Sequence, residues 1–477
     1  MRLLLPLLLV LSVCTRGRAQ VLVSAEEQDP ALAFILNLSL PIVATYDVQN
    51  IKILYNTTDV FGQPTVASGL LCVPANPNNV YPMAVYNHGT VSDREQVPSR
   101  EGVLERLLPQ GIASQGYITV APDYLGLGDN PGIHPYVHAD SEASAGRDLL
   151  LAAKEWLAAN NRRQNGQLFL TGYSQGGHAT AALHRELVQN PTPGLEVTSA
   201  TYLSGPYSIA DVMRTTIFED ELVTLPGYIA YTYASYDYVY GLYDSLGQVF
   251  VPPYVTLTDS FVNQTIQLGE YDALLTARLM ENDHILADIF QDSIRQQLAD
   301  NDPNDPIIRA LRDNDTYDWA PDEPTLIYYC TADLQVPPRN AILADSVMRA
   351  NGAMNVTLEN GGALSHGGCV IPAAVRTLDF WSGLVNIFPT STLTLQQEEP
   401  FILAPNPVRL GEEMRFLTPD GAAVHYRLYD MTGREVLRGV SGPGSGVRVP
   451  AELTAGTFVL KAELASGESV VRRIIVR

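Results

Sequence analysis

The feature that most constrains the fold is a regular alternation of apolar runs and helical stretches in the first half of the chain. The apolar runs cover residues 81–86, 116–121, 167–171 and 197–203, and the helical stretches lie near 101–114, 141–160 and 177–190. Strands joined by helices run parallel, and parallel sheets carry helices on both faces. The pattern predicts an α/β fold with a mostly parallel sheet, preceded by two or three further strands within residues 42–73.

The alternation lapses between about residues 208 and 320. This region is rich in tyrosine and has helical periodicity near 270–300, so it predicts an inserted helical cap. Strand and helix patterns then return between residues 325 and 387. We therefore assign residues 20–392 to one α/β domain that contains the cap.

Both ends of the chain differ from this domain. Residues 1–19 combine Arg2, a short apolar run and small residues before a cleavage point, which is typical of a secretory signal peptide; lipidation at Cys14 is the alternative. Residues 393–401 form a polar linker. Residues 402–477 show short alternating segments separated by turns, which predict a small all-β sandwich.

The charge of the chain excludes some partners. With 30 Lys and Arg against 52 Asp and Glu, the net charge is −22. This acidity argues against nucleic acid and against an anionic membrane surface, which both need clustered positive charge. It fits either the ordinary solubility of an exported protein or an adaptation to salt, and the sequence leaves both readings open.

The strongest motif runs from Gly172 to Gly177 and reads Gly-Tyr-Ser-Gln-Gly-Gly. It follows a predicted strand and opens a predicted helix, which is the context of a nucleophile elbow. The glycines permit a tight turn that exposes the hydroxyl of Ser174 at a helix N-terminus. Ser174 is the candidate nucleophile; a glycine-rich turn without chemistry is the alternative.

A serine needs a general base, and the base needs a carboxylate that orients it. In this fold class the order along the chain is Ser, acid, His. Asp333 lies just after one predicted strand, and His366 follows the last predicted strand. We predict Asp333 as the acid and His366 as the base. The remaining histidines are predicted to be structural or exposed.

The negative oxygen that forms during acyl transfer needs two backbone N–H donors. Gln175 directly follows the candidate nucleophile, and Thr90 lies in the loop after the apolar run at 81–86. We predict their amides as the donors. Asp123, at the end of another strand, either lines the pocket or holds a turn.

Cys330 precedes Asp333 by three residues, and Cys369 follows His366 by three. Oxidising conditions outside the cell permit disulfides. We therefore hypothesise a Cys330–Cys369 disulfide beside the acid and the base. No spacing of His, Cys or acidic residues predicts a metal site, and no cofactor is predicted.

Together these motifs resemble the α/β-hydrolase superfamily, and within it the secretory lipase family of esterases. The resemblance rests on Asn87 to Thr90, Ala121 to Gly128, Gly172 to His178, and the Asp333 and His366 pair, and it covers residues 42–390. It implies a cap over the pocket and hydrolysis of carboxylic esters.

The tail resembles the C-terminal sorting domain of the type IX secretion system. The similar segments are Pro405 to Pro407, Tyr429 to Val436, Leu453 to Phe458 and the basic end from Arg472. The resemblance implies secretion machinery as a partner and a secreted or cell-surface location. A spacer or carbohydrate-binding sandwich is the alternative.

The sequence therefore predicts an exported serine esterase or lipase that acts on a small-molecule ester or lipid. Two other hypotheses stay open. One is a serine peptidase of the same fold, and the other is a non-catalytic cell-surface adhesion protein.

Overall fold

The computed structural model describes residues 20–219, 225–389, 402–404, 408–417, 423–430, 434–442, 446–464 and 469–477. The predicted signal peptide and the predicted linker lie outside these residues. Within the described ranges, no helix combines the length and the apolar character needed to cross a bilayer.

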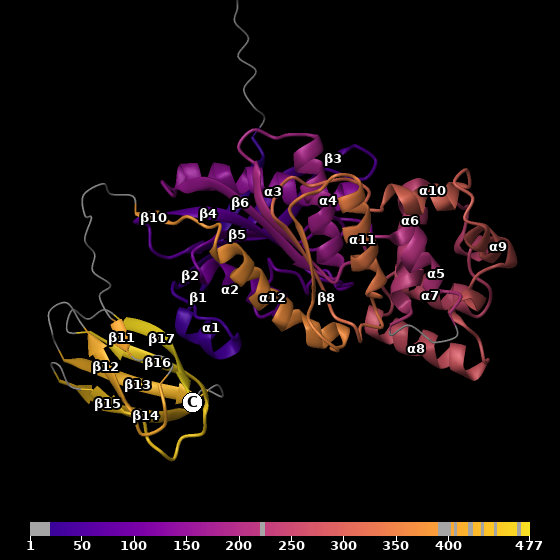
Figure 1. The fold of residues 1–477 in the computed structure, drawn as a ribbon. Coiled ribbons are helices and arrows are strands. Elements are labelled where there is room, and N and C mark those ends of the chain that lie inside the picture. The colour runs from indigo at the N-terminus through magenta and orange to yellow at the C-terminus, as the bar shows by residue number, and fades with distance from the viewer. Residues whose placement is uncertain are drawn as a thin grey trace, which may run out of the picture.

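A ten-stranded sheet forms the centre of the larger domain (Figure 1). Its order is β1-β2-β3-β5-β4-β6-β7-β8-β9, and β10 pairs with β4. The six strands from β5 to β9 run parallel, while β1, β2 and β3 are antiparallel. The strands are β1 (Leu22–Ala31), β2 (Val48–Thr58), β3 (Pro64–Pro74), β4 (Asn79–Asn87), β5 (Ile118–Pro122), β6 (Gln164–Tyr173), β7 (Val197–Leu203), β8 (Thr325–Tyr329), β9 (Val356–Asn360) and β10 (Phe388–Pro389).

Helices cover both faces of this sheet, so the predicted α/β class with a mostly parallel sheet is confirmed. On one face, α3 (Ala139–Ala159), α4 (Gln175–Gln189) and α11 (Arg339–Ala350) share an apolar core with the strands. On the other face, α1 (Ala33–Ser39), α2 (Leu107–Ser114) and α12 (His366–Ser382) pack through a second cluster. The central strands β4 and β6 are apolar because both of their faces are covered.

The insertion between β7 and β8 is helical and has its own apolar cluster of tyrosine, phenylalanine and aliphatic side chains. It lies at one end of the sheet, in the rose and salmon part of Figure 1. Its helices are η2 (Ile209–Met213), α5 (Arg214–Thr216), α6 (Gly227–Tyr240), α7 (Tyr254–Val262), α8 (Leu268–Glu281), α9 (Asp292–Asp300) and α10 (Pro306–Asp313), with short turns η3 (Leu246–Gln248) and η4 (Leu286–Ile289).

The C-terminal part is a small antiparallel β domain with two sheets. One has the order β11-β12-β15 and the other the order β14-β13-β16-β17. One apolar cluster contains residues of both sheets, as expected for a sandwich. The strands are β11 (Ile402–Ala404), β12 (Glu413–Leu417), β13 (Val424–Asp430), β14 (Glu435–Ser441), β15 (Gly446–Arg448), β16 (Gly456–Glu463) and β17 (Ser469–Val476).

Two elements differ from the sequence analysis. The edge strand β1 was not predicted, because most of its residues are exposed and no apolar alternation marks it. Helix α12 begins at His366 instead of near residue 371, since Ser365 accepts a hydrogen bond from the Gly368 amide as its N-cap. The candidate base therefore stands at a helix N-terminus and not in a free turn.

Candidate functional site

Ser174 occupies a strained turn between β6 and α4. Its φ of 60° and ψ of −123° lie in a region that side chains rarely adopt. Only glycine fits at two positions near this serine. A Cβ on Gly176 would lie 1.9 Å from the Asn87 carbonyl oxygen, and one on Gly172 would lie 2.2 Å from the Gly176 carbonyl oxygen. The backbone is therefore built to hold the serine in this conformation.

Asp333 and His366 form a buried hydrogen-bonded pair. Nδ1 of His366 donates to Oδ2 of Asp333 across 2.6 Å, and the carboxylate side chain is 1% exposed. The amides of Gln335 and Val336 both donate to Oδ1 of Asp333 at 2.9 Å. These bonds hold the carboxylate in place beside the His366 ring.

Tyr173 links this pair to the serine turn. Its hydroxyl donates to the His366 carbonyl oxygen at 2.6 Å, and the two rings lie 5.0 Å apart between centroids. Ser174 and the Gln335–Val336 segment also line one pocket. No direct hydrogen bond joins the described side chains of Ser174 and His366, so that contact belongs to the proposal below.

The loop after β4 lies against the same turn. A Cβ on Gly89 would be 3.5 Å from the backbone carbonyl oxygen of Tyr173 and 4.0 Å from the Cβ of Ser174. In the described part of the chain, the backbone amides of Thr90 and Gln175 have no acceptor. The Thr90 hydroxyl shares a 2.9 Å hydrogen bond with Tyr136. One amide without an acceptor thus directly follows Ser174, and another directly follows the glycine that approaches it.

A buried polar network holds Gln175, and sequence reasoning missed it. The side-chain Nε2 of Gln175 donates to Glu142 Oε1 and to Nε2 of His134, both at 2.8 Å. Nδ1 of His134 donates to the Leu125 oxygen, and burial lowers the pKa of His134 to about 3. The ring is therefore a neutral acceptor that helps to position the residue after the nucleophile.

Glu142 also bonds His178 at 2.7 Å, and the other nitrogen of that ring lies 2.8 Å from the Asn314 oxygen. Both ring nitrogens of His178 therefore have a partner, one on the Glu142 side chain and one on the backbone oxygen of Asn314. One signal was present in the sequence: Glu142 stands on the apolar stripe of α3, beside Ala143 and one turn after Ala139. His134 lies in a loop, where no sequence pattern indicated its role.

Asp123 and His88 have structural roles. Asp123 is fully buried, and it accepts hydrogen bonds from Ser68 Oγ at 2.6 Å and from the Ser99 amide at 3.0 Å. Of the two readings left open for Asp123, the structure therefore favours the turn. His88 packs on Tyr124 with ring centroids 4.3 Å apart and shapes the loop that contains Thr90.

A disulfide joins Cys330 to Cys369, with Cα atoms 6.2 Å apart. It connects the loop of Asp333 to the first turn of α12, so it braces both members of the acid–base pair. Cys72 is a free, buried thiol, and burial raises its pKa to about 12.

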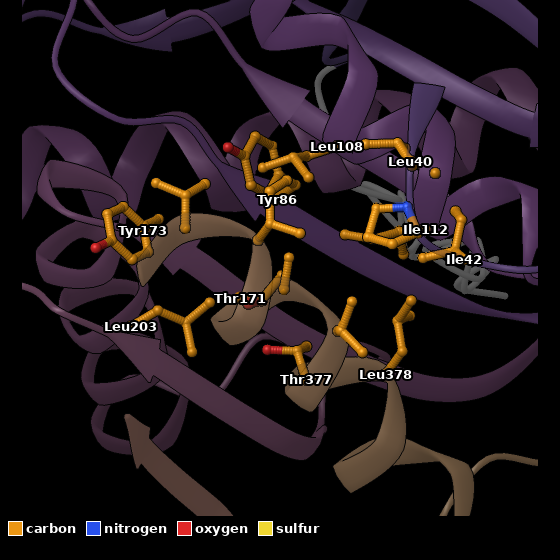
Figure 2. A pocket seen from close by; sticks show the side chains of 16 residues that line it. Leu40, Ile42, Tyr86, Leu108, Ile112, Thr171, Tyr173, Leu203, Thr377 and Leu378 are labelled. Carbon is orange, nitrogen blue, oxygen red and sulfur yellow. The ribbon is translucent and has the colours of Figure 1, made fainter. Parts of the chain in front are cut away.

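Two pockets lie near these residues. The first has a volume of about 660 Å³ including its open mouth, and it lies between Ser174 and cap residues of η2 and α6. The second, of about 510 Å³, is apolar and lies between α2 and α12 (Figure 2). Because none of Ser174, Asp333 and His366 lines the second pocket, the first is the candidate substrate site. Over the described residues, no cluster of His, Cys, Asp and Glu could hold a metal ion.

The solved structures to which the chain is similar include a hydrolase, an esterase and a lipase. A protein of Legionella pneumophila described as a candidate hydrolase has a TM-score of 0.69 and 26% identity, covering 79% of this chain and all of that one. The rice cell wall degrading esterase LipA of Xanthomonas oryzae has a TM-score of 0.66 and 26% identity, covering 77% of this chain and 99% of that one.

Candida antarctica lipase A in its closed state has a TM-score of 0.58 and 16% identity, covering 77% of this chain and 83% of that one. No protein-family model and no curated protein matches the chain. The larger domain has the α/β-hydrolase type of fold.

Proposed function

We propose that this protein is an exported serine hydrolase that cleaves carboxylic esters. The observation that carries the proposal is the buried His366–Asp333 hydrogen bond of 2.6 Å next to a serine in a strained elbow. Serine hydrolases need that combination, in which the carboxylate orients the base and the base activates the hydroxyl. The esterase LipA, which shares the fold at 26% identity, supports the ester class, and the Legionella protein supports a hydrolase.

In the proposed reaction, Oγ of Ser174 attacks the ester carbonyl while Nε2 of His366 accepts the hydroxyl proton. The amides of Thr90 and Gln175 stabilise the negative oxygen of the tetrahedral intermediate. His366 then gives the proton to the departing alcohol, which leaves an acyl-enzyme on Ser174. A water molecule, activated by the same histidine, releases the acid and restores the serine.

Replacement of the nucleophile tests this proposal. Ser174→Ala should lower kcat for p-nitrophenyl butyrate by at least about 1,000-fold, because the remaining groups cannot form the acyl-enzyme. Ser260→Ala, on α7, removes a surface serine hydroxyl and should leave kcat unchanged. Equal turnover by wild type and Ser174→Ala would refute the proposal.

Two further measurements separate the alternative functions. A matched p-nitroanilide substrate distinguishes an esterase from a serine peptidase of the same fold. A fluorophosphonate probe should label wild type and not Ser174→Ala. Absence of labelling together with absence of turnover would favour a non-catalytic adhesion protein.

We also propose that residues 402–477 direct the protein to the type IX secretion system, after removal of a signal peptide at residues 1–19. The segments that carry the resemblance include the end of β13 and the start of β16, and Asp430 pairs with Phe458 where these two strands adjoin in the centre of the four-stranded sheet. A compact sandwich with its own apolar core can serve as a separate sorting signal, because the residues of that core all come from the C-terminal domain.

A further inference from the structure

Two polar side chains in the wall of the candidate substrate pocket have donors without acceptors. Arg214 is 8% exposed and Tyr233 is 5% exposed, and both line the pocket that contains Ser174. Nε of Arg214 donates to the Ala210 oxygen at 2.6 Å, and Nη1 donates to the Leu298 oxygen. Among the described residues, nothing accepts a hydrogen bond from Nη2 of Arg214 or from the Tyr233 hydroxyl.

Over the described residues, the charge of Arg214 also has no counter-ion. No ion pair between described residues includes it, and Asp211, the acid whose charge reaches Arg214, is held by Arg312 at 3.1 Å. Guanidinium groups stay protonated in proteins, and a buried cation without a counter-ion is costly. Such a group in a substrate pocket is therefore expected to meet an anion that arrives with the substrate.

The rest of the pocket restricts the shape of that substrate. Apolar side chains, among them Ile209, Ile229 and Leu311, line the wall together with Arg214 and Tyr233. They suit a short hydrocarbon segment and offer no further cation. A guanidinium N–H and a phenolic hydroxyl together match the two oxygens of one carboxylate.

We propose that this pocket takes an ester that also carries a free carboxylate, and that Arg214 and Tyr233 bind that carboxylate. The inference rests on the serine hydrolase function proposed above. It deepens that function by naming a substrate class: half-esters of dicarboxylic acids, or esters of alcohols that bear a carboxylate.

Paired substrates test the proposal and separate the two sources of the carboxylate. For the acid part, p-nitrophenyl hemiglutarate is compared with its neutral isostere, p-nitrophenyl 5-methylhexanoate. For the alcohol part, 4-acetoxybenzoate is compared with 4-acetoxybenzamide. In each pair the ratio of kcat/KM, charged over neutral, measures recognition of the carboxylate alone.

Arg214→Met should lower that ratio about 10- to 100-fold in at least one pair, since hydrogen bonds to charged groups have that worth. Tyr233→Phe should lower it about fivefold, and turnover of the neutral ester should stay within about threefold of wild type. Arg278→Met is the matched control, because Arg278 lies on α8 and donates to the Pro253 oxygen outside the pocket. Its ratio should equal that of wild type.

An unchanged ratio in both pairs for Arg214→Met would overturn the proposal, as would an equal loss on charged and neutral esters. If Arg214→Met does not fold, competitive inhibition is measured instead on wild type and Tyr233→Phe. Glutarate should inhibit wild type more strongly than the neutral glutaramide does. Equal inhibition of wild type by the two compounds would overturn the proposal. Hydrolysis of neutral esters that depends on Ser174 but shows no preference for a carboxylate refutes this inference alone. Absence of any hydrolysis that depends on Ser174 refutes the proposed function instead.

Discussion

Removal of the disulfide offers a quantitative test of how the acid–base pair is stabilised. The bond between Cys330 and Cys369 closes a loop with a sequence separation of 39 residues. In the chain-entropy model, a crosslink over such a loop destabilises the unfolded state by about 4 kcal/mol. The double variant Cys330→Ala/Cys369→Ala should lose about that much free energy of unfolding.

Urea unfolding followed by tryptophan fluorescence measures this loss. Trp156, Trp319 and Trp381 are the three tryptophans of the chain, and all lie in the larger domain, so the signal reports on that domain. The slope in urea is about 1–3 kcal/mol per molar for small proteins and is larger for a domain of this size, so the midpoint should fall by about 1 M. Ester hydrolysis should disappear at the same lower urea concentration, since α12 holds His366.

Reductant provides the matched control. It should lower the midpoint of wild type to that of the double variant and should leave the double variant unchanged. Cys72, which remains in both proteins, is buried and free, so it contributes equally. A double variant within about 1 kcal/mol of wild type would refute the view that this crosslink braces the site.

Two further predictions concern acid stability and export. The pKa of His134 is about 3 in the folded protein, because burial disfavours its charged form, against an ordinary value of 6.5. Between those values the unfolded chain binds a proton that the folded chain does not, so the free energy of unfolding decreases as the pH is lowered, by up to about 1.4 kcal/mol per pH unit. Urea midpoints between pH 7 and pH 4 should fall less steeply for His134→Gln; equal slopes would contradict the assignment. For export, residues 402–477 fused to a periplasmic reporter should carry it to the surface or medium of a host with a type IX system. The reporter alone should stay inside, and retention of the fusion to the same extent would exclude the sorting role.

Strong local patterns account for the parts of the fold that were predicted from sequence. Strand β6, the glycine-rich turn and α4 follow one another directly, so the change from apolar residues to glycines and then to helix-forming residues indicates where each element lies. The edge strand β1 escaped because a strand with one neighbour and exposed side chains needs no apolar alternation. Its pairing with β2 is a tertiary contact that no local window contains.

The same distinction applies to the site. Ser174, Asp333 and His366 follow strands, where their positions could be predicted, and the proximity of Cys330 and Cys369 followed from the same placement. The acceptors of Gln175 come from α3 and from a loop 41 residues upstream. Only the folded chain brings Glu142 and His134 together, so their contacts could not be read from sequence spacing.

The apolar cluster of the cap is distinct from the cluster between the central sheet and α3, α4 and α11, and it also takes in Tyr136 and Val137 from the loop before α3. Ser174, Asp333 and His366 depend on the helices and strands of the central sheet, whereas Arg214 and Tyr233 depend on the packing of the cap. A substitution inside the cap cluster therefore acts first on the pocket wall, while bonds such as that from His178 to the Asn314 oxygen connect the cap to α4. Chains of this design can acquire new substrates by variation in one part while the other retains an intact reaction centre.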